Sequence, residues 1–275
     1  MIRKQVINNK ETLIISGFNM NQIMKMNKHN RFNNNIKKFV DSSNSEPIIN
    51  LPIEDNIIPL NIFQTWHTLK LPPKMQENVD LLKAQNPEFI HYLYDDEMCR
   101  SFIKNNFNIN VLYAFDTLIP GAYKCDLWRL CILYKYGGIY LDIKYSCNDP
   151  FKLIQLCNKE YWVRDYNYGI YQALMVNLPN NRILMEAINK IVYNVKNRLY
   201  LSTPLDITGP QLLGKFFNKS QKDNFELSLN CDKGGILYNN TLILKAYPEY
   251  KGEQNANELK QYYSILWHKR EVYTL

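Results

Sequence analysis

The segment from Asp126 to Lys144 carries carboxylate, guanidinium and ammonium groups at spacings that can bring them together. Asp126 and Arg129 lie three positions apart, so on a helix they share one face. Tyr140, Asp142 and Lys144 alternate along a strand-like stretch, so they point to one side. A carboxylate there can hold a divalent cation or a ribose hydroxyl. The structural alternative is two ion pairs, Asp126 with Arg129 and Asp142 with Lys144.

The elements around this segment help to decide between the two interpretations. A helix is expected over 124–136, and because it is apolar almost all round it should be buried. Gly137 and Gly138 end the helix, and a β-rich strand over 139–143 follows directly. This order places Asp142 at the carboxyl end of a strand, the edge where open α/β sheets bind ligands. The order of elements therefore favours a binding site over isolated ion pairs.

Strand and helix patterns alternate from about Ile57 onward. Strands are expected at 59–66, 88–96, 139–143 and 173–176, and helices at 72–86, 95–107, 124–136, 150–157 and 181–196. The stretch 234–248 is typical of a hairpin. Alternating elements predict an α/β fold with a largely parallel sheet, in one domain over residues 51–275. Residues 1–50 are rich in Asn and Lys and are interpreted as an N-terminal extension.

Composition narrows the class of protein. The 275 residues are 46% hydrophobic, enough for one large core, and the formal net charge is +7. Acidic and basic residues are mixed, so this charge favours anionic partners such as nucleotides or phosphates only weakly. The six cysteines form no CxxC pair, which favours reduced thiols over disulfides or a zinc site. No apolar run reaches the length of a membrane span and the start lacks a signal peptide, so a cytoplasmic location without a transmembrane segment is expected.

The run YKCDLWRLCILYKYGGIYLD resembles the core signature of glycosyltransferase family 32 and its relatives, which include alpha-1,6-mannosyltransferases and large clostridial toxin glucosyltransferases. Other segments resemble this family in the same order: IPLNIFQTWHTLKLPPKM, NPEFIHYLYDDE, DITGPQLLGKFF and LWHKR. The resemblance covers residues 57–268. It implies a single domain of GT-A type, with a Rossmann-like, mostly parallel mixed sheet flanked by helices.

The resemblance also implies roles for individual residues. Donor binding would fall to Gln64, Trp66, Asp126, Arg129, Tyr140, Asp142, Gly209, Pro210 and Trp267. The catalytic residues would be Asp142, Arg129, Lys144 and His268, and the metal ligands would be Asp142 and His268. In these roles Trp66 stacks beside the nucleotide base, and Trp267 and His268 close over the diphosphate. The implied cofactor is Mn²⁺ or Mg²⁺.

Lys144 departs from the family pattern, because it stands where the second acid of the DxD motif is expected. That acid normally binds the divalent cation that neutralises the departing diphosphate. Three interpretations stay open: weak metal binding through Asp142 and phosphates, metal-independent transfer with Lys144 as the cation, or loss of transfer. Asp149 is a candidate replacement ligand. The four histidines show no metal-binding spacing, and His91, in an alternating strand, is interpreted as structural.

The expected function is that of a glycosyltransferase that moves a hexose or N-acetylhexosamine from a nucleotide diphosphate sugar to a hydroxyl of a glycan or protein. A UDP-sugar is favoured as donor, and the resemblance implies retention of anomeric configuration. One alternative, motivated by Lys144, is a catalytically inactive module that binds nucleotide sugars or carbohydrate. Another is a basic nucleic-acid-binding protein, motivated by the net charge and the Lys/Asn-rich start. The transferase is preferred, and no nucleic acid partner is expected.

Overall fold

The computed structural model describes residues 2–7, 10–15, 56–166, 169–232, 234–257 and 262–275. The chain divides into two compact units, Met1–Pro47 and Ile48–Leu275. In the first unit, β1 (Ile2–Ile7) pairs antiparallel with β2 (Lys10–Ile15), a hairpin that the sequence analysis did not predict. The rest of the predicted extension lies outside the described residues.

The sheet that carries the predicted site has four strands in the order β4-β3-β5-β8. These strands are β3 (Asn61–Thr65), β4 (Ile90–Tyr94), β5 (Gly138–Leu141) and β8 (Leu174–Asn177). β3 runs parallel to both β4 and β5, while β8 runs antiparallel to β5. The sheet is therefore mixed, and the prediction of an α/β fold with strands in these four places is confirmed.

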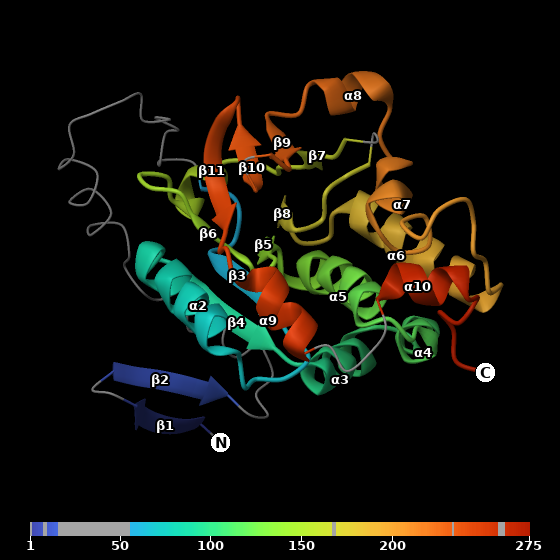
Figure 1. The fold of residues 1–275 in the computed structure, drawn as a ribbon, viewed down its shortest axis with the longest axis horizontal. Helices are drawn as coiled ribbons and strands as arrows, with labels where there is room; N and C mark the ends of the chain where they lie inside the picture. Colours follow the sequence, from blue (N-terminus) through green and yellow to red (C-terminus); the bar gives the residue numbers. More distant parts are fainter. Residues whose placement is uncertain (1, 8–9, 16–55, 167–168, 233, 258–261) are drawn as a thin grey trace. The chain divides into compact units, whose positions relative to one another are not determined.

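Helices flank this sheet: α2 (Pro73–Gln85), α3 (Asp96–Asn106), α4 (Ile109–Thr117), α5 (Gly121–Tyr136) and α6 (Arg182–Lys196). In Figure 1, α5 and α6 lie to the right of the strands and α2 lies to their left. The Asp95 side chain caps α3 by accepting from the Met98 backbone N–H at 2.8 Å. Of these helices only α4 was not predicted, and Asn108 caps its first turn. The helix order confirms the alternating pattern.

A second sheet was not predicted. Its order is β6-β11-β10-β9-β7, and every pairing is antiparallel except that of β7 with β9. Its strands are β6 (Tyr145–Cys147), β7 (Val163–Arg164), β9 (Leu227–Asn230), β10 (Gly235–Tyr238) and β11 (Thr241–Ala246). The predicted hairpin at 234–248 is confirmed as β10 and β11.

Short helices complete the described chain: η3 (Leu153–Leu156), α7 (Pro210–Gly214), α8 (Lys219–Asp223), α9 (Tyr250–Asn257) and α10 (Tyr263–His268). The helix expected over 150–157 is wrong in type and length, because η3 is a single 3-10 turn. The Cys157 N–H donates to the Ile154 carbonyl three residues back, the bond of a 3-10 turn.

One apolar core joins the two sheets. Buried residues of the four-stranded sheet pack with buried residues of the second sheet; the cluster includes Ile62, Ile139, Leu141, Leu174, Val176, Cys147, Leu227, Ile236 and Leu244. Each such side chain contributes about 1.5–3 kcal/mol on full burial. The second sheet therefore packs against the face of the four-stranded sheet that points away from α5.

Two glycines connect α5 directly to β5. Gly137 and Gly138 have φ angles of +62° and +111°, which only glycine adopts easily. A Cβ on Gly138 would lie 2.7 Å from the Asn61 carbonyl oxygen, and one on Gly137 would lie 2.6 Å from Pro179 Cδ. Because only Gly137 separates the two elements, side chains on α5 and at the end of β5 hold a fixed relation.

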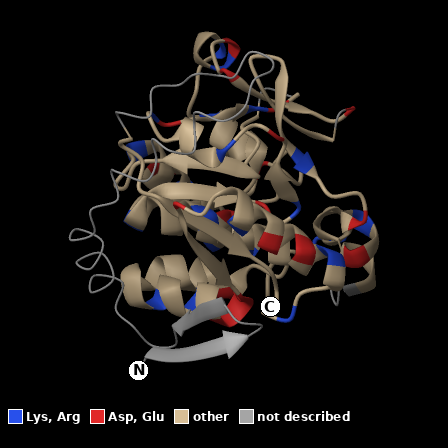
Figure 2. Ribbon diagram, turned by 90° about the vertical axis from the view of Figure 1, so that its left-hand side faces the viewer, with Lys and Arg blue, Asp and Glu red and all other residues tan. Residues whose placement is uncertain are grey.

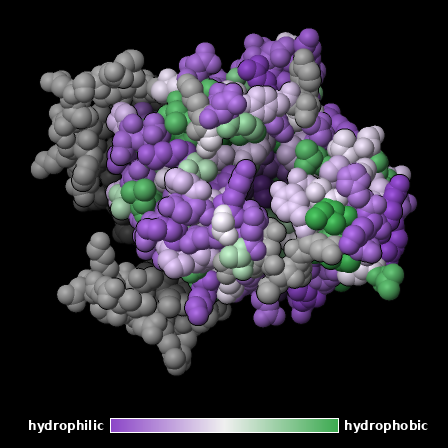
Figure 3. All heavy atoms as spheres, viewed as in Figure 1, coloured by the Kyte–Doolittle hydropathy of each residue, from purple (hydrophilic) through white to green (hydrophobic). Residues whose placement is uncertain are grey.

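The surface of the described residues is polar and mixed in charge. Figure 2 shows basic and acidic residues interspersed along the ribbon, and Figure 3 shows apolar residues in small patches separated by polar ones. Among the described helices, none has the length and apolar character needed to cross a membrane. All six cysteines are free thiols, and only Cys231 is exposed.

Candidate functional site

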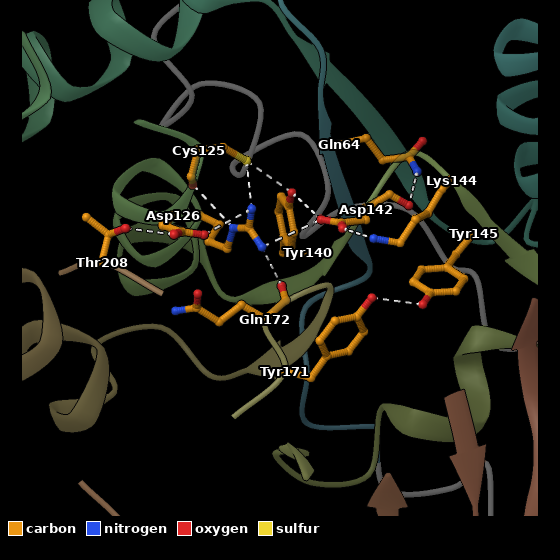
Figure 4. A network of polar contacts seen from close by, with 11 residues as sticks. Gln64, Cys125, Asp126, Tyr140, Asp142, Lys144, Tyr145, Tyr171, Gln172 and Thr208 are labelled. Carbon is orange, nitrogen blue, oxygen red and sulfur yellow. Dashed lines mark hydrogen bonds and ion pairs between the residues drawn. The ribbon is translucent and has the colours of Figure 1, made fainter. Parts of the chain in front are cut away.

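Asp142 is the centre of a polar network just past the end of β5 (Figure 4). The Tyr140 hydroxyl donates to its Oδ1 at 2.8 Å, and Arg129 Nη1 lies 3.6 Å from the same oxygen. Lys144 Nζ lies 2.5 Å from its Oδ2. Both carboxylate oxygens therefore face cations or hydroxyl donors, and the grouping predicted from the spacing is present.

The route by which Lys144 reaches Asp142 differs from the prediction. β5 ends at Leu141, so the expected strand over 139–143 is too long. The next residues form a turn closed by the Tyr145 N–H, which donates to the Asp142 carbonyl at 3.0 Å. Buried Asn78 of α2 holds this turn by donating to the Ile143 and Tyr145 carbonyls. Asn78 is thus a positioning residue that sequence reasoning missed.

Arg129 joins the helix to the strand. Its Nη2 lies 3.4 Å from Asp126 Oδ1, and its Nη1 donates to the Gln172 carbonyl at 2.9 Å. The guanidinium also lies over the Tyr140 ring, 4.4 Å from the centroid. The predicted ion pair of Asp126 and Arg129 is therefore real, and it is part of one network with Asp142.

Asp126 connects this network to the loop before α7. Thr208 Oγ1 donates to Asp126 Oδ2 at 2.8 Å. A Cβ added at Gly209 would lie 3.4 Å from that oxygen, an ordinary van der Waals contact, so the Gly209 backbone lies beside the carboxylate. Pro210 begins α7, and its carbonyl accepts from the Ile170 N–H at 3.0 Å. Gly209 thus lies at the site as predicted, whereas Pro210 acts through its backbone.

The two carboxylates have pKa values shifted in opposite directions. Burial alone would raise the pKa of Asp142, but Lys144 and Arg129 outweigh burial and hold that pKa at about 2. Burial raises the pKa of Asp126 to about 6, although Arg129 and Thr208 oppose the rise. Asp142 is therefore a fixed negative charge, while Asp126 changes its charge near neutral pH.

Lys144 sits in a cage of tyrosines. Its ammonium lies 5.1, 5.6 and 5.7 Å from the ring centroids of Tyr145, Tyr171 and Tyr250. The Tyr145 and Tyr171 hydroxyls are themselves hydrogen-bonded at 3.0 Å. Burial alone would lower the pKa of Lys144, but Asp142 raises it above the ordinary lysine value. The ammonium is therefore charged and held in one place by Asp142 and three aromatic faces.

Gln64 and Trp66 lie at the end of β3, beside the network. Gln64 Nε2 is 3.5 Å from the Asp142 carbonyl, and its Oε1 lies 2.8 Å from His91 Nε2. Trp66 packs against Met75 and Ile143, and its indole N–H is buried without a partner among the described residues. Neither side chain contacts the Asp142 carboxylate, so their predicted donor-binding roles stay predictions.

The buried His91 ring is expected to make the free energy of unfolding depend on pH. Burial lowers its pKa to about 3, so the folded protein keeps the ring neutral while the unfolded chain protonates below about pH 6.5. The stabilisation from the neutral ring is complete above pH 6.5 and is lost as the pH falls. The loss amounts to about 3 kcal/mol at pH 4.5. Urea unfolding of the wild type and of His91→Gln at pH 7.5 and 4.5 checks it. Equal pH dependence in both proteins would contradict the assignment.

Trp267 and His268 lie on α10. Within the described part of the chain, the Trp267 indole N–H donates to the Tyr200 carbonyl at 2.7 Å, and His268 is exposed with its ring against Trp267. α10 approaches α5 through Tyr263, whose ring lies 5.7 Å from that of Tyr123. The structure therefore does not bring Trp267 and His268 together with Asp142.

The described residues do not fit a protein-held Mn²⁺ or Mg²⁺ at Asp142. A hard divalent cation takes several oxygen ligands, but Asp142 faces Lys144 and Arg129, and His268 lies elsewhere. No group of three or more His, Cys, Asp or Glu side chains among these residues is arranged to hold a metal. Asp149 contacts Gln85 at 3.5 Å and does not join the network.

Gln172 is a candidate that sequence reasoning missed. It precedes β8 and is only 2% exposed, yet neither its amide nitrogen nor its amide oxygen has a partner among the described residues. Figure 4 shows its side chain extending on the side of Asp126 and Thr208. An unpaired buried amide is unfavourable, so a ligand hydroxyl is a fitting partner. No local pattern marks Gln172, because it reaches the network from the turn before β8.

Comparisons with known proteins match the segment of the chain that contains Asp126 through Lys144. Residues 72–163, which contain Asp126 through Lys144, match the family described as "Glycosyltransferase sugar-binding region containing DXD motif". Inositol phosphoceramide mannosyltransferase 2 of Schizosaccharomyces pombe is 28% identical over 194 residues, which cover 66% of this chain and 54% of that protein. Inositol phosphoceramide mannosyltransferase 3 of the same yeast is 33% identical over 139 residues, covering 49% and 37%.

The chain spans about half the length of the first of these curated relatives and less of the second. Among solved structures, PaToxG glycosyltransferase aligns with a TM-score of 0.42 and 16% identity, over 57% of this chain and 67% of that one. The family match covers Asp126, Arg129, Asp142 and Lys144 of the network. Residues 72–163 of this chain are therefore similar to the sugar-binding region of glycosyltransferases that contains a DXD motif.

Proposed function

We propose that this chain transfers a hexose from a nucleoside diphosphate sugar to an acceptor hydroxyl. The observation that carries the proposal is the buried network of Asp126, Arg129 and Asp142 at the carboxyl end of β5, inside the matched sugar-binding region. Mannose is the first sugar to test, because both yeast relatives are named mannosyltransferases. Their names also make an inositol phosphate headgroup the first acceptor to test, before glycans and proteins.

The proposed reaction uses the network for binding and charge. The anomeric C–O bond to the diphosphate breaks and its electron pair stays on the phosphate oxygen. The acceptor oxygen bonds to the anomeric carbon, and the acceptor proton passes to the departing diphosphate. Asp142 and Asp126 accept hydrogen bonds from ribose or sugar hydroxyls, and Arg129 keeps both carboxylates in place. Catalysis rests on positioning and on neutralising the leaving group, with retention of configuration as the family resemblance implies.

A donor panel tests the proposal. The purified chain is incubated with GDP- and UDP-linked hexoses and N-acetylhexosamines, with inositol phosphate and simple glycosides as acceptors. We expect one donor to release its nucleoside diphosphate together with a glycosylated product detected by mass. The alternative of an inactive binding module, motivated by Lys144, predicts donor binding without product. Absence of product from every donor, with binding intact, would favour that alternative over transfer.

Replacement of Gln172 is expected to lower donor affinity without lowering thermal stability. Gln172→Met removes the unpaired amide at similar volume, so we expect unchanged or higher thermal stability. If the amide binds a donor hydroxyl, donor affinity falls by about tenfold. Asn177→Leu is the matched control, because Asn177 is also buried with an unpaired amide on β8 but lies at the far end of that strand. Equal donor affinity in wild type and Gln172→Met would contradict the assignment.

A further inference from the structure

We infer that the Lys144 ammonium takes the place of the divalent cation in this chain, so that the donor diphosphate binds without a metal. The inference rests on the proposed function, because it names the group that faces the diphosphate of the proposed donor. It makes Lys144 a catalytic residue of the network rather than the partner of a structural ion pair.

The position of Lys144 favours this role. Lys144 occupies the second acidic place of the motif, and its Nζ lies 2.5 Å from Asp142 Oδ2. Two acids at these places would supply oxygen ligands to a divalent cation. Here the chain instead places a positive charge directly beside the first acid. A divalent cation at Asp142 would have to lie close to both this ammonium and the Arg129 guanidinium, and like charges repel.

The Lys144 side chain is immobilised before any ligand binds. An ordinary surface lysine is flexible and loses side-chain entropy on binding an anion. Lys144 has already lost that freedom, because Asp142 and the rings of Tyr145, Tyr171 and Tyr250 surround its ammonium. The Tyr247 N–H also donates to the Lys144 carbonyl at 3.1 Å. A fixed cation of this kind stabilises developing negative charge without reorganisation.

Lys144 is also partly accessible to a ligand. The Lys144 side chain is 18% exposed, so the cage leaves part of it open. An ammonium has three N–H donors, and Asp142 takes one of them. The aromatic faces accept no strong hydrogen bond, so N–H groups remain for a phosphate oxygen. When the anomeric C–O bond breaks, the electron pair left on that oxygen is stabilised by the ammonium, which keeps its proton.

Nucleoside diphosphate binding measured by calorimetry tests the inference, with GDP and UDP as probes in Mn²⁺ and in EDTA. We expect the wild type to bind one of them with the same affinity in both conditions, within about twofold. Lys144→Met should weaken binding about tenfold or more in both conditions, and Lys144→Arg should keep most of the affinity. Lys144→Asp should bind the nucleotide only with Mn²⁺, and the Mn²⁺ itself should be detected on that variant by electron paramagnetic resonance.

Lys159→Met is the matched control. Lys159 also forms an ion pair, with Glu226 at 2.6 Å, and lies over a tyrosine ring at 5.1 Å, but it is outside the network. Its replacement should leave nucleotide affinity unchanged, and thermal unfolding of each variant establishes that it is folded.

The outcomes separate the inference from the proposed function. Wild-type affinity that rises tenfold with Mn²⁺, or full affinity in folded Lys144→Met, would overturn the role of Lys144 and leave transfer standing. Metal-independent binding without product would support Lys144 as the diphosphate-binding cation and overturn transfer. No binding of either nucleotide to the wild type would overturn both.

Discussion

Asp142→Asn is expected to reduce kcat/KM for sugar transfer by about a hundredfold or more, the effect of removing one preorganised charge from an active site. Asparagine keeps the shape of the side chain but removes the charge that holds Lys144, Arg129 and Tyr140 in place. The pKa of about 2 shows that the fold stabilises the ionised form, and at neutral pH this contributes about 2 kcal/mol to the free energy of unfolding.

Steady-state kinetics and urea unfolding measure the two effects of Asp142→Asn. Asp116→Asn is the control, because Asp116 also pairs with an arginine, Arg100, but at an exposed position. It should change neither rate nor stability appreciably. An undiminished transfer rate in folded Asp142→Asn would refute the proposed role of the carboxylate.

Arg129→Leu is expected to give the largest loss of stability, about 3–5 kcal/mol, because it leaves the buried Asp126 carboxylate without a counter-charge. Arg129 lies between Asp126 and Asp142, and its side chain is 9% exposed. The pKa of Asp126, about 6 in the folded protein, exceeds its value in the unfolded chain, about 3.9. Stability from this group therefore falls as the pH rises from 4 to 6, and without Arg129 the fall continues to higher pH.

Urea unfolding of Arg129→Leu at pH 5 and pH 8 checks this prediction. The loss relative to wild type should be greater at pH 8, and adding Asp126→Asn to Arg129→Leu should recover part of it, because the two residues are coupled. Arg100→Leu should show a much smaller, pH-independent loss, since its pair with Asp116 is exposed. Additive effects of Arg129→Leu and Asp126→Asn would contradict the proposed coupling.

The sequence was informative where contacts are local. The i,i+3 spacing of Asp126 and Arg129, the Gly137-Gly138 turn and the placement of Tyr140 beside Asp142 all depend on neighbouring residues. Helical periodicity and strand alternation reflect the same local geometry. For this reason β3, α2, β4, α3, α5 and β5 were predicted in the right order.

Contacts between distant segments could not be predicted in this way. Tyr171, Tyr250 and Gln172 reach the network from other elements, and no spacing links them to Asp142. The second sheet pairs Cys147 with Leu244, a relation that alternation within one strand does not encode. Tyr171, Tyr250 and Gln172 decide how Lys144 is held and what surrounds the ligand.

The family resemblance named Trp267 and His268 as candidate site residues from their order in the chain, but it did not give their contacts. Trp267 and His268 lie on a short helix whose described contacts run to Tyr200 and, through Tyr263, to Tyr123. A sequence motif specifies residue types and their order, whereas the contacts of those residues depend on how the intervening chain packs. Their predicted roles over the diphosphate accordingly stay predictions.

The direct junction between α5 and β5 has a consequence for the order of folding. Arg129 and Asp142 are joined by a short stretch of chain, whereas β6 meets β11 only after a long loop closes, and closure entropy grows with loop length. We expect the helix–strand pair to form before the second sheet, while its charges are still hydrated. Each carboxylate then pairs with its cation while both groups are still hydrated. The chain therefore does not bury an unpaired charge during folding.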